Sequence, residues 1–127
     1  MITGINHIGI CVNNIEDAAK FFGDNLDAKV TETVEYSELG QISTFIELKD
    51  GLKFEVMTPM GEGGVVEKFL EKHGEGFHHI SLLTDDFDNT VAKCAENGCR
   101  IIPGGEKYAF IHPKSGKGIL YEICQEQ

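Results

Sequence analysis

The sequence predicts an α+β protein in which two tandem βαβββ modules form one curved mixed sheet. The main observation is an internal repeat, because residues 6–17 resemble residues 78–89. Within the repeat His7 aligns with His79, at an offset of 72 positions (79 − 7). A second observation is that each copy is followed by a helical pattern and then by three short strand-like segments. Neither copy is long enough to bury a core alone, so we expect both to share one sheet.

Polar residues mark where the helix of each module begins. Asn13 and Asn14 precede the first helix, and Asp85 and Asp86 precede the second. Such side chains accept hydrogen bonds from the backbone N–H groups of the first turn. Gly98 follows the second helix, as expected for a helix C-terminus. The apolar positions at helical spacing are Ile15, Ala18, Ala19, Phe22 and Leu26 in the first helix, Phe87, Val91, Cys94 and Ala95 in the second, and Val66, Phe69 and Leu70 in a connecting helix.

Each of these two helices is followed by three segments whose residue pattern predicts strands. We expect a single domain over residues 1–127, with modules at about 1–60 and 76–127 and a helical connector at 65–74. The predicted strands are residues 29–35, 42–48 and 52–57 in the first module and residues 100–102, 106–111 and 119–124 in the second, with turns at 49–51 and 113–118.

Length and composition favour one cytoplasmic domain with one core. The chain has 127 residues, of which 41% are hydrophobic. No apolar run approaches the roughly 18 residues of a membrane span, and the first residues lack the basic and apolar pattern of a signal peptide. The four cysteines form no Cys-x-x-Cys pair, so we expect reduced structural thiols. They are Cys11, Cys94, Cys99 and Cys124.

The charge balance argues against two classes of partner. The formal net charge is −10, from 21 acidic and 11 basic residues. A field of that sign repels phosphate backbones, so we expect no binding to nucleic acid or to anionic membranes. An anionic small molecule is not excluded, because a local basic cluster can outweigh the overall field. Arg100 is the only arginine, so lysines must supply most of such a cluster.

Four side chains that can bind a metal occupy matched positions in the predicted strands of the two modules. His7 and His79 alternate with isoleucines, and each has a small residue two positions further on. Glu55 and Glu122 stand in the last strand of each module, 67 positions apart (122 − 55). Burying a carboxylate in an apolar strand costs several kcal/mol unless a partner compensates it. A pseudo-twofold relation between the modules would bring all four side chains together around a metal site.

Two imidazoles and two carboxylates make a mixed nitrogen and oxygen site. Such a set suits one divalent Zn, Ni, Co or Mn ion and suits calcium poorly. Each residue taken alone has an ordinary interpretation, because a strand histidine is usually structural and an inward glutamate often pairs with a lysine. The repetition at matched positions is what favours a metal site with His7, Glu55, His79 and Glu122 as ligands.

Several motifs resemble the vicinal oxygen chelate superfamily, the glyoxalase/bleomycin resistance/dioxygenase group, and within it the methylmalonyl-CoA epimerases most closely. The resemblance covers nearly the whole chain, and it implies the two-module fold and the same four metal ligands. The motifs that carry it are residues 6–10, 54–59, 68–80 and 112–118 followed by 120–122.

The resemblance also implies an activity. Such family members are metal-dependent epimerases or isomerases that abstract an α-proton and stabilise the resulting enediolate on the metal. The family carries an acidic residue before a glycine, and Glu38 before Leu39 and Gly40 is similar. Glu38 and Glu122 are therefore the candidate catalytic bases, and the sequence does not choose between them. An exposed turn carboxylate is the ordinary interpretation of Glu38.

The substrate is left open among related compounds. His112, Lys114 and Lys117 are candidates to contact an anionic substrate, with solvated turn residues as the ordinary interpretation. An acyl-CoA fits the resemblance, although residues 103–105 and 63–65 depart from the epimerase pattern where such a substrate would make contact. A lactoylglutathione lyase acting on a glutathione hemithioacetal is the alternative, and a metal-free small-molecule binding or resistance protein is a third. A homodimer is expected, as is common in such folds.

Overall fold

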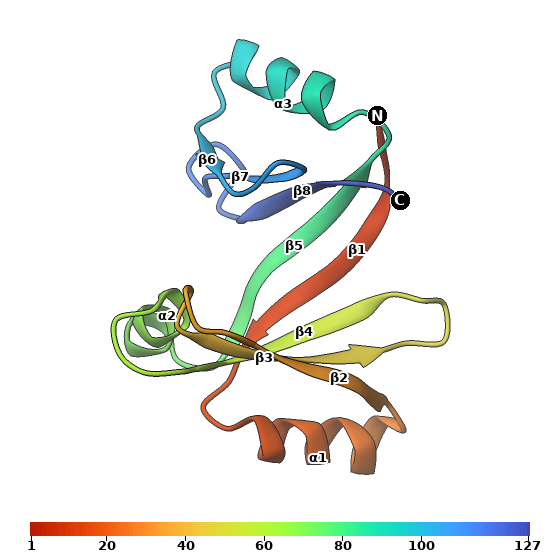
Figure 1. Cartoon of the computed structure of the whole chain (residues 1–127), viewed down its shortest axis with the longest axis vertical. Coiled ribbons are helices and arrows are strands. Elements are labelled where there is room, and N and C mark those ends of the chain that lie inside the picture. The colour runs from red at the N-terminus through yellow and green to blue at the C-terminus, as the bar shows by residue number, and fades with distance from the viewer. The chain divides into compact units, whose positions relative to one another are not determined.

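The computed structural model describes residues 1–127 and contains eight strands and three helices (Figure 1). The order strand, helix and three strands occurs twice along the chain, so the predicted α+β class with two βαβββ repeats is confirmed. The elements are β1 (Ile2–Cys11), α1 (Ile15–Leu26), β2 (Lys29–Tyr36), β3 (Gln41–Glu47), β4 (Lys53–Pro59), α2 (Val65–His73), β5 (Gly76–Thr84), α3 (Phe87–Glu96), β6 (Ile101–Pro103), β7 (Tyr108–Ile111) and β8 (Tyr121–Gln125).

The strands follow one another in the hydrogen-bonded order β2-β3-β4-β1-β5-β8-β7-β6. β5 and β8 are parallel, whereas β3 pairs antiparallel with β2 and β4, and β7 pairs antiparallel with β6 and β8. The mixed character of the sheet is thereby confirmed. The chain divides into a central unit, Ile8–His78, and a C-terminal unit, Met1–His7 with His79–Gln127. β1 and β5 therefore contribute residues to both units.

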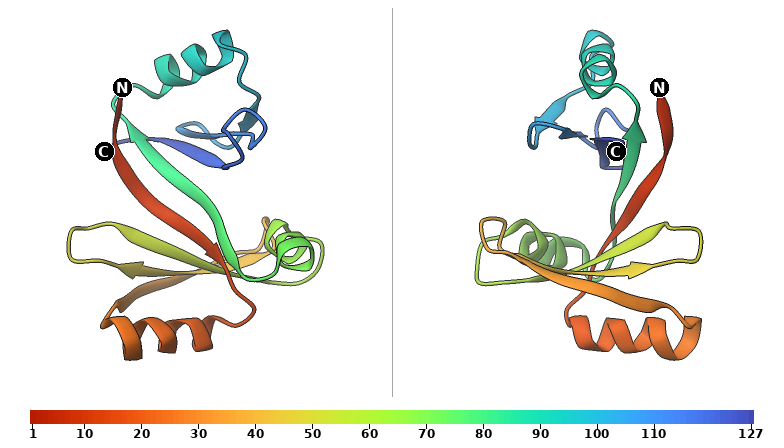
Figure 2. Two further views of the ribbon diagram at one scale, coloured as in Figure 1. Left: turned by 180° about the vertical axis from the view of Figure 1, so that it is seen from behind. Right: turned by 45° about the vertical axis from the view of Figure 1, so that its right-hand side comes forward.

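In the central unit, α1 lies along one face of the strands (Figures 1 and 2). The helix begins after Asn14, whose side-chain oxygen accepts a hydrogen bond from the Asp17 N–H at 2.9 Å. A buried cluster beneath it contains Phe22 from α1 together with Val12, Ile46 and Val56. The last helical residue, Leu26, is 59% exposed and does not share this packing.

The opposite face of the central unit packs against α2. Its buried cluster joins Val66 to Cys11 and Met57, and Phe69 and Leu70 pack around them. The predicted inward face of the connecting helix is therefore confirmed. Cys11 and Val12 are neighbours in the chain but belong to different clusters, as strand alternation requires.

In the C-terminal unit, α3 covers one face of the strands. The helix begins after Asp86, whose side chain accepts a hydrogen bond from a backbone N–H of the first turn at 3.2 Å. Phe87 of this helix forms a buried cluster with Ala109 of β7 and Ile123 of β8. Because side chains alternate along β5 and β8, the polar residues next to these core positions lie on the other face.

Two strands of the second module begin later than the sequence indicated. β7 starts at Tyr108, because the chain turns tightly at two glycines and the Gly105 N–H donates to the Tyr108 carbonyl at 2.9 Å. A Cβ atom on Gly104 would lie 2.5 Å from the Tyr108 ring, so the turn requires a glycine there. β8 starts at Tyr121, because the preceding turn extends to Ile119, whose N–H donates to the Gly116 carbonyl at 3.2 Å.

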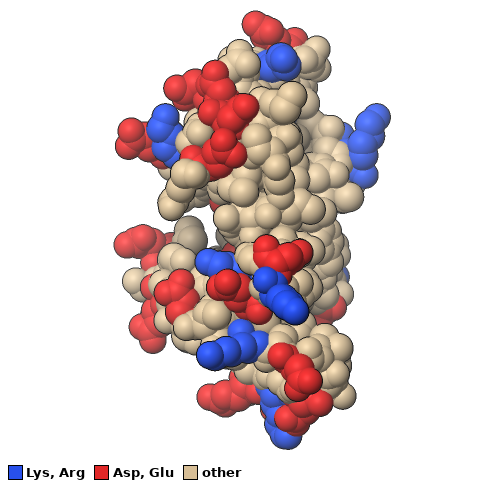
Figure 3. Space-filling model, turned by 90° about the vertical axis from the view of Figure 1, so that its right-hand side faces the viewer, with Lys and Arg blue, Asp and Glu red and all other residues tan.

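Acidic residues outnumber basic ones, 21 against 11, which gives the net charge of −10. Figure 3 shows acidic side chains spread over the face in view, with lysine and arginine side chains among them. None of the three helices combines the length and the apolar character needed to span a membrane.

Candidate metal centre

Three neighbouring strands position the candidate ligands of the C-terminal unit. His7 lies on β1, His79 on β5 and Glu122 on β8, and these strands are consecutive in the sheet. The parallel register places Ser81 of β5 opposite Glu122. Since Ile123 faces the core beneath α3, alternation turns the adjacent Glu122 to the opposite face.

The three side chains converge closely. His7 Nε2 lies 3.0 Å from His79 Nε2 and 3.2 Å from Glu122 Oε1, and His79 Nε2 lies 3.9 Å from the same carboxylate oxygen. One ligand atom from each residue lies within 4.8 Å of the others. His79 is only 5% exposed, so the centre is shielded from water. Two imidazole nitrogens and a carboxylate oxygen form a donor set that fits a divalent transition metal.

The ionisation of Glu122 suits metal binding. Burial raises the pKa of Glu122, but hydrogen bonding to His7, the charges of both histidines and a hydrogen bond from Ser81 outweigh it, so the pKa is lowered overall. The carboxylate is therefore ionised at neutral pH. His7 Nδ1 donates to the side-chain oxygen of Asn6 at 2.6 Å, which leaves Nε2 as the nitrogen that faces the centre.

Ser81 is a supporting residue that the sequence reasoning missed. It is fully buried, it hydrogen-bonds to Glu122, and its Oγ lies 3.3 Å from Cys124 Sγ. Burial is the largest cause that raises the pKa of the Cys124 thiol, to about 11, so this thiol stays protonated at neutral pH. The signal available in the sequence was the position of Ser81 two residues after His79, which puts both on one face of the strand.

Glu55, the fourth predicted ligand, belongs to the central unit. It is 8% exposed, and its Oε2 accepts a hydrogen bond from Ser43 Oγ at 2.8 Å. Gln41 Nε2 in turn donates to Ser43 Oγ at 3.1 Å. Burial, together with the charge of Glu55, raises the pKa of the Cys11 thiol to about 12. The structure thus brings together His7, His79 and Glu122, and the role of Glu55 as a ligand stays a prediction.

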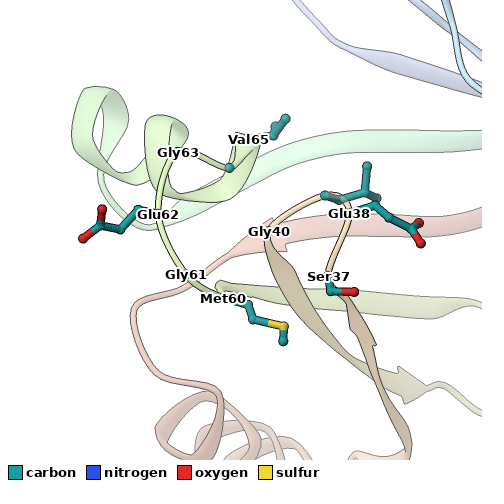
Figure 4. A pocket seen from close by; sticks show the side chains of 10 residues that line it. Ser37, Glu38, Gly40, Met60, Gly61, Glu62, Gly63 and Val65 are labelled. Carbon is teal, nitrogen blue, oxygen red and sulfur yellow. The ribbon is translucent and has the colours of Figure 1, made fainter.

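Glu38, the candidate base, lines a pocket of about 440 Å³ in the central unit (Figure 4). The pocket lies between the turn from β2 to β3 and the loop that leads into α2. These two segments touch through their backbones, because a Cβ atom on Gly64 would lie 2.8 Å from the carbonyl oxygens of Leu39 and Gly40. The lining residues are Ser37, Glu38, Leu39, Gly40, Met60, Gly61, Glu62, Gly63, Gly64 and Val65.

Two features noted in the sequence line this pocket together. The acidic residue before a glycine and the segment 63–65, which departs from the epimerase pattern, line the same space. The Met60 N–H donates to the Gly40 carbonyl at 2.9 Å and ties the two segments together. Glu38 itself is exposed to solvent, so it is accessible for proton transfer. Its role as a base stays a prediction.

The predicted substrate contacts lie in an ordered turn of the C-terminal unit. Lys114 and Lys117 are exposed there, whereas His112 is half-buried. The Lys114 N–H donates to His112 Nδ1 at 3.0 Å, and the Arg100 N–H donates to Ser115 Oγ at 2.9 Å. These backbone contacts hold the turn while both lysine side chains remain available to an anion. Their contact with a substrate stays a prediction.

Comparison with protein families identifies the class of protein to which this fold and site correspond. Residues 6–114 match the model of the Glyoxalase/Bleomycin resistance protein/Dioxygenase superfamily. The chain therefore belongs to this superfamily, as the motifs predicted.

Similar proteins narrow the class further. The chain is 33% identical to the ethylmalonyl-CoA/methylmalonyl-CoA epimerase of Cereibacter sphaeroides, over 98% of this chain and 99% of that protein. The methylmalonyl-CoA epimerase of Mycobacterium tuberculosis is 25% identical with a TM-score of 0.88, over 99% of this chain and 89% of that one. The Streptomyces coelicolor enzyme, solved with 2-nitronate-propionyl-CoA, is 28% identical with a TM-score of 0.87 and covers 99% of both chains. All three are epimerases, which favours the epimerase prediction over the lyase alternative.

Proposed function

We propose that this protein is a metal-dependent epimerase that acts on an acyl-CoA thioester, with methylmalonyl-CoA as its substrate. The observation that carries the proposal is the convergence of His7, His79 and Glu122 on one point in the C-terminal unit. The epimerase relatives support both the reaction and the class of substrate. The convergence of these three donors argues against a metal-free binding protein.

In this proposal His7, His79 and Glu122 hold one divalent ion, with Glu55 as the fourth ligand. Zn, Ni, Co and Mn all accept such nitrogen and oxygen donors. When bound, the ion supplies Lewis-acid stabilisation of the negative charge that develops as an α-proton leaves the thioester. The hydrogen bond between His7 and Asn6 orients the imidazole, and Ser81 orients the carboxylate of Glu122.

Glu38 is the better candidate for the base. The carboxylate of Glu122 is engaged by two histidines and Ser81, so its oxygens are committed to holding the centre. Glu38 lines a pocket and does not belong to the cluster of candidate metal-ligand atoms. A Glu38 carboxylate oxygen takes the α-proton, and return of a proton to the opposite face of that carbon inverts its configuration.

The exposed turn between β7 and β8 is proposed to meet the anionic part of the substrate. An acyl-CoA carries several negative charges, and the protein's net charge of −10 opposes its approach. Lys114 and Lys117 place two positive charges within a single turn, where they attract phosphate groups locally. Assembly as a homodimer also stays a prediction, which light scattering on the purified protein tests.

Deuterium exchange followed by NMR tests the function. The purified protein, with and without each divalent metal, is incubated in D₂O with methylmalonyl-CoA. We expect exchange at the α-carbon only in the metal-loaded protein. A parallel incubation with the methylglyoxal–glutathione adduct should give no turnover. Turnover of that adduct without α-carbon exchange in methylmalonyl-CoA would overturn the proposed substrate.

The Glu38→Gln variant separates the base from the metal site. Because glutamine cannot accept the proton, exchange should fall by about 10²- to 10⁴-fold while the bound metal stays at the wild-type level. The variant Glu62→Gln is the matched control, since Glu62 lines the same pocket and has no role in the proposal. If Glu38→Gln retained wild-type exchange, Glu38 would not be the base.

A further inference from the structure

Two cysteines lie side by side where α3 ends. The helix closes with the Cys99 N–H donating to the Cys94 carbonyl at 3.0 Å and the Gly98 N–H donating to the Ala95 carbonyl at 3.0 Å. Gly98 adopts the left-handed conformation, with φ of 86°. This pair of bonds around a left-handed glycine defines the Schellman motif of a helix C-terminus.

The Schellman motif brings together the side chains at the two positions that the cysteines occupy. Where this motif ends a helix, an apolar contact frequently forms between these positions, three residues inside the helix end and two beyond it. Here the contact is between two thiols. Burial raises the pKa of Cys94, and the neighbouring Cys99 raises it further through its charge and through a hydrogen bond between the two side chains.

The other two cysteines lack such a thiol partner. Cys11 is fully buried between the strands and α2 in the central unit. Cys124 lies beside Ser81, at 3.3 Å from its hydroxyl oxygen. Cys94 and Cys99 are both partly exposed and reduced, so a small reagent can reach them. A fixed, accessible pair of thiols differs from the reduced structural thiols expected from the sequence, which would have no redox role.

We propose that Cys94 and Cys99 form a redox-responsive dithiol that closes reversibly to an intramolecular disulfide by exchange with a small-molecule disulfide. The helix end already holds the two residues on adjacent turns, so the bond needs no long-range movement. Disulfides that form and reopen in this way are typically regulatory rather than structural.

The exchange proceeds in two balanced steps. The Cys99 thiolate attacks one sulfur of the small-molecule disulfide, whose S–S bond breaks and releases one thiolate. Cys94 then loses its proton to solvent and attacks the Cys99 sulfur, and the second thiolate leaves. The two protein thiols are oxidised by two electrons, and the reagent is reduced to two thiols. Cys99 is placed first because burial raises the pKa of the Cys94 thiol.

The position of the pair links it to the turn that carries the candidate substrate lysines. Cys99 is followed by Arg100, whose carbonyl accepts from the His112 N–H at 2.9 Å and whose N–H donates to Ser115 Oγ at 2.9 Å. Closing the disulfide restrains the segment that anchors this turn. Any effect on substrate binding rests on the proposed function, but formation of the disulfide does not.

Treatment of the full chain with oxidised glutathione tests the proposal. Free thiols counted by alkylation after denaturation should fall from four to two. Intact mass should drop by two hydrogens, and peptide mapping should join Cys94 to Cys99. Dithiothreitol should restore all four thiols. Retention of four thiols, or a disulfide that joins any other pair, would overturn the proposal.

Two single variants check the order of the steps. In Cys94→Ser the first step still occurs, so a mixed disulfide with glutathione should accumulate on Cys99. In Cys99→Ser the disulfide cannot form, and because burial still raises the pKa of Cys94, this thiol should react with glutathione more slowly than Cys99 does in Cys94→Ser. Circular dichroism confirms that both variants fold. A wild-type protein that carries a lasting glutathione adduct on Cys99 would contradict a paired dithiol, and this result is independent of metal content and of epimerase activity.

Discussion

The central unit and the C-terminal unit each carry a glutamate on the last strand of a repeat, buried in the case of Glu55 and half-buried in the case of Glu122, yet they stabilise it by different means. In the central unit the neutral hydroxyl of Ser43 donates to Glu55, and Gln41 supports Ser43. In the C-terminal unit Glu122 faces the ring nitrogens of His7 and His79, and Ser81 adds a hydrogen bond.

The difference shows how one repeated strand pattern yields two kinds of site. An ionised carboxylate leaves water only if other groups replace its hydration. Hydroxyl and amide donors do so without adding charge, whereas two imidazoles with a carboxylate also make a donor set for a metal. Helix placement contributes, because α1 and α2 cover opposite faces in the central unit whereas α3 covers the face opposite Glu122.

Removing either glutamate tests the comparison most strongly. Glu122→Ala should abolish stoichiometric metal binding and epimerase activity, because the remaining donors of its cluster are two histidines. We expect metal affinity to fall by more than the roughly 100-fold that loss of a supporting residue costs. Inductively coupled plasma mass spectrometry on the dialysed protein measures the bound metal.

Glu55→Ala is the matched variant in the other unit. If Glu55 is the fourth ligand, its removal should also lower bound metal well below one ion per chain. Full metal occupancy in Glu55→Ala would show that the site has three protein ligands and that Glu55 serves only the central unit. Thermal unfolding of both variants without metal provides the control for general destabilisation.

Ser43 and Ser81 offer a finer comparison of the two networks. Each is fully buried and hydrogen-bonds to the glutamate of its own unit. Ser43→Ala and Ser81→Ala should each weaken metal affinity by about 10- to 100-fold, with the glutamates still present. Competition with a fluorescent chelator measures the change. If Ser43→Ala kept wild-type metal affinity while Ser81→Ala lost affinity, the Glu55 network would not contribute to the metal site.

A backbone contact in the central unit gives a prediction about stability. Gly64→Ala would place a methyl group 2.8 Å from two carbonyl oxygens of the β2–β3 turn, so the free energy of unfolding should fall by about 1–3 kcal/mol. Gly23→Ala in α1 is the control, since its nearest atom is 4.0 Å away and alanine favours a helix. Urea denaturation of both variants measures the difference. Equal stability of Gly64→Ala and the wild type would mean that the two segments separate freely.

The smallest effect at neutral pH is expected from Cys11. Burial, with the charge of Glu55, raises the pKa of its thiol from 9.0 to about 12 in the folded protein. The unfolded chain releases this proton from about pH 9 upward while the folded state keeps it. Stability from this group is thus complete below pH 9 and is lost as the pH rises toward 12.

The comparison of wild type with Cys11→Ala isolates this contribution. The free energy of unfolding of the wild type should decline more steeply between pH 8 and pH 11 than that of Cys11→Ala. Urea denaturation across this range measures the slope, and other titrating groups cancel because both proteins contain them. Parallel slopes would mean that the thiol is hydrated in the folded state.

Local sequence rules predicted much of the fold. Helices begin after Asn14 and Asp86, where the side chains accept hydrogen bonds from the first turn. In the C-terminal unit, His79 lies on the opposite face of its strand from the neighbouring apolar residues, as alternation predicts. These features depend on residues within a few positions of one another, so the sequence contains the information directly.

Features that depend on contacts between distant segments were harder to predict. Ser43 and Ser81 look like ordinary strand residues until the register places them beside Glu55 and Glu122. The contact of Gly64 with the β2–β3 turn joins residues about 24 positions apart (64 − 40). No local pattern predicts that the thiols of Cys94 and Cys99 pair, because only the Schellman motif turns Cys99 back toward Cys94.

The sequence by itself determined the two βαβββ repeats, the helix boundaries near their polar caps and the candidate residues for the chemistry. These follow from side-chain periodicity and from the local hydrogen bonding of the backbone. Only the tertiary structure decided that β1, β5 and β8 stand side by side, with His7, His79 and Glu122 at one point. Strand order and register depend on how the whole sheet buries its apolar faces, and no local pattern specifies them.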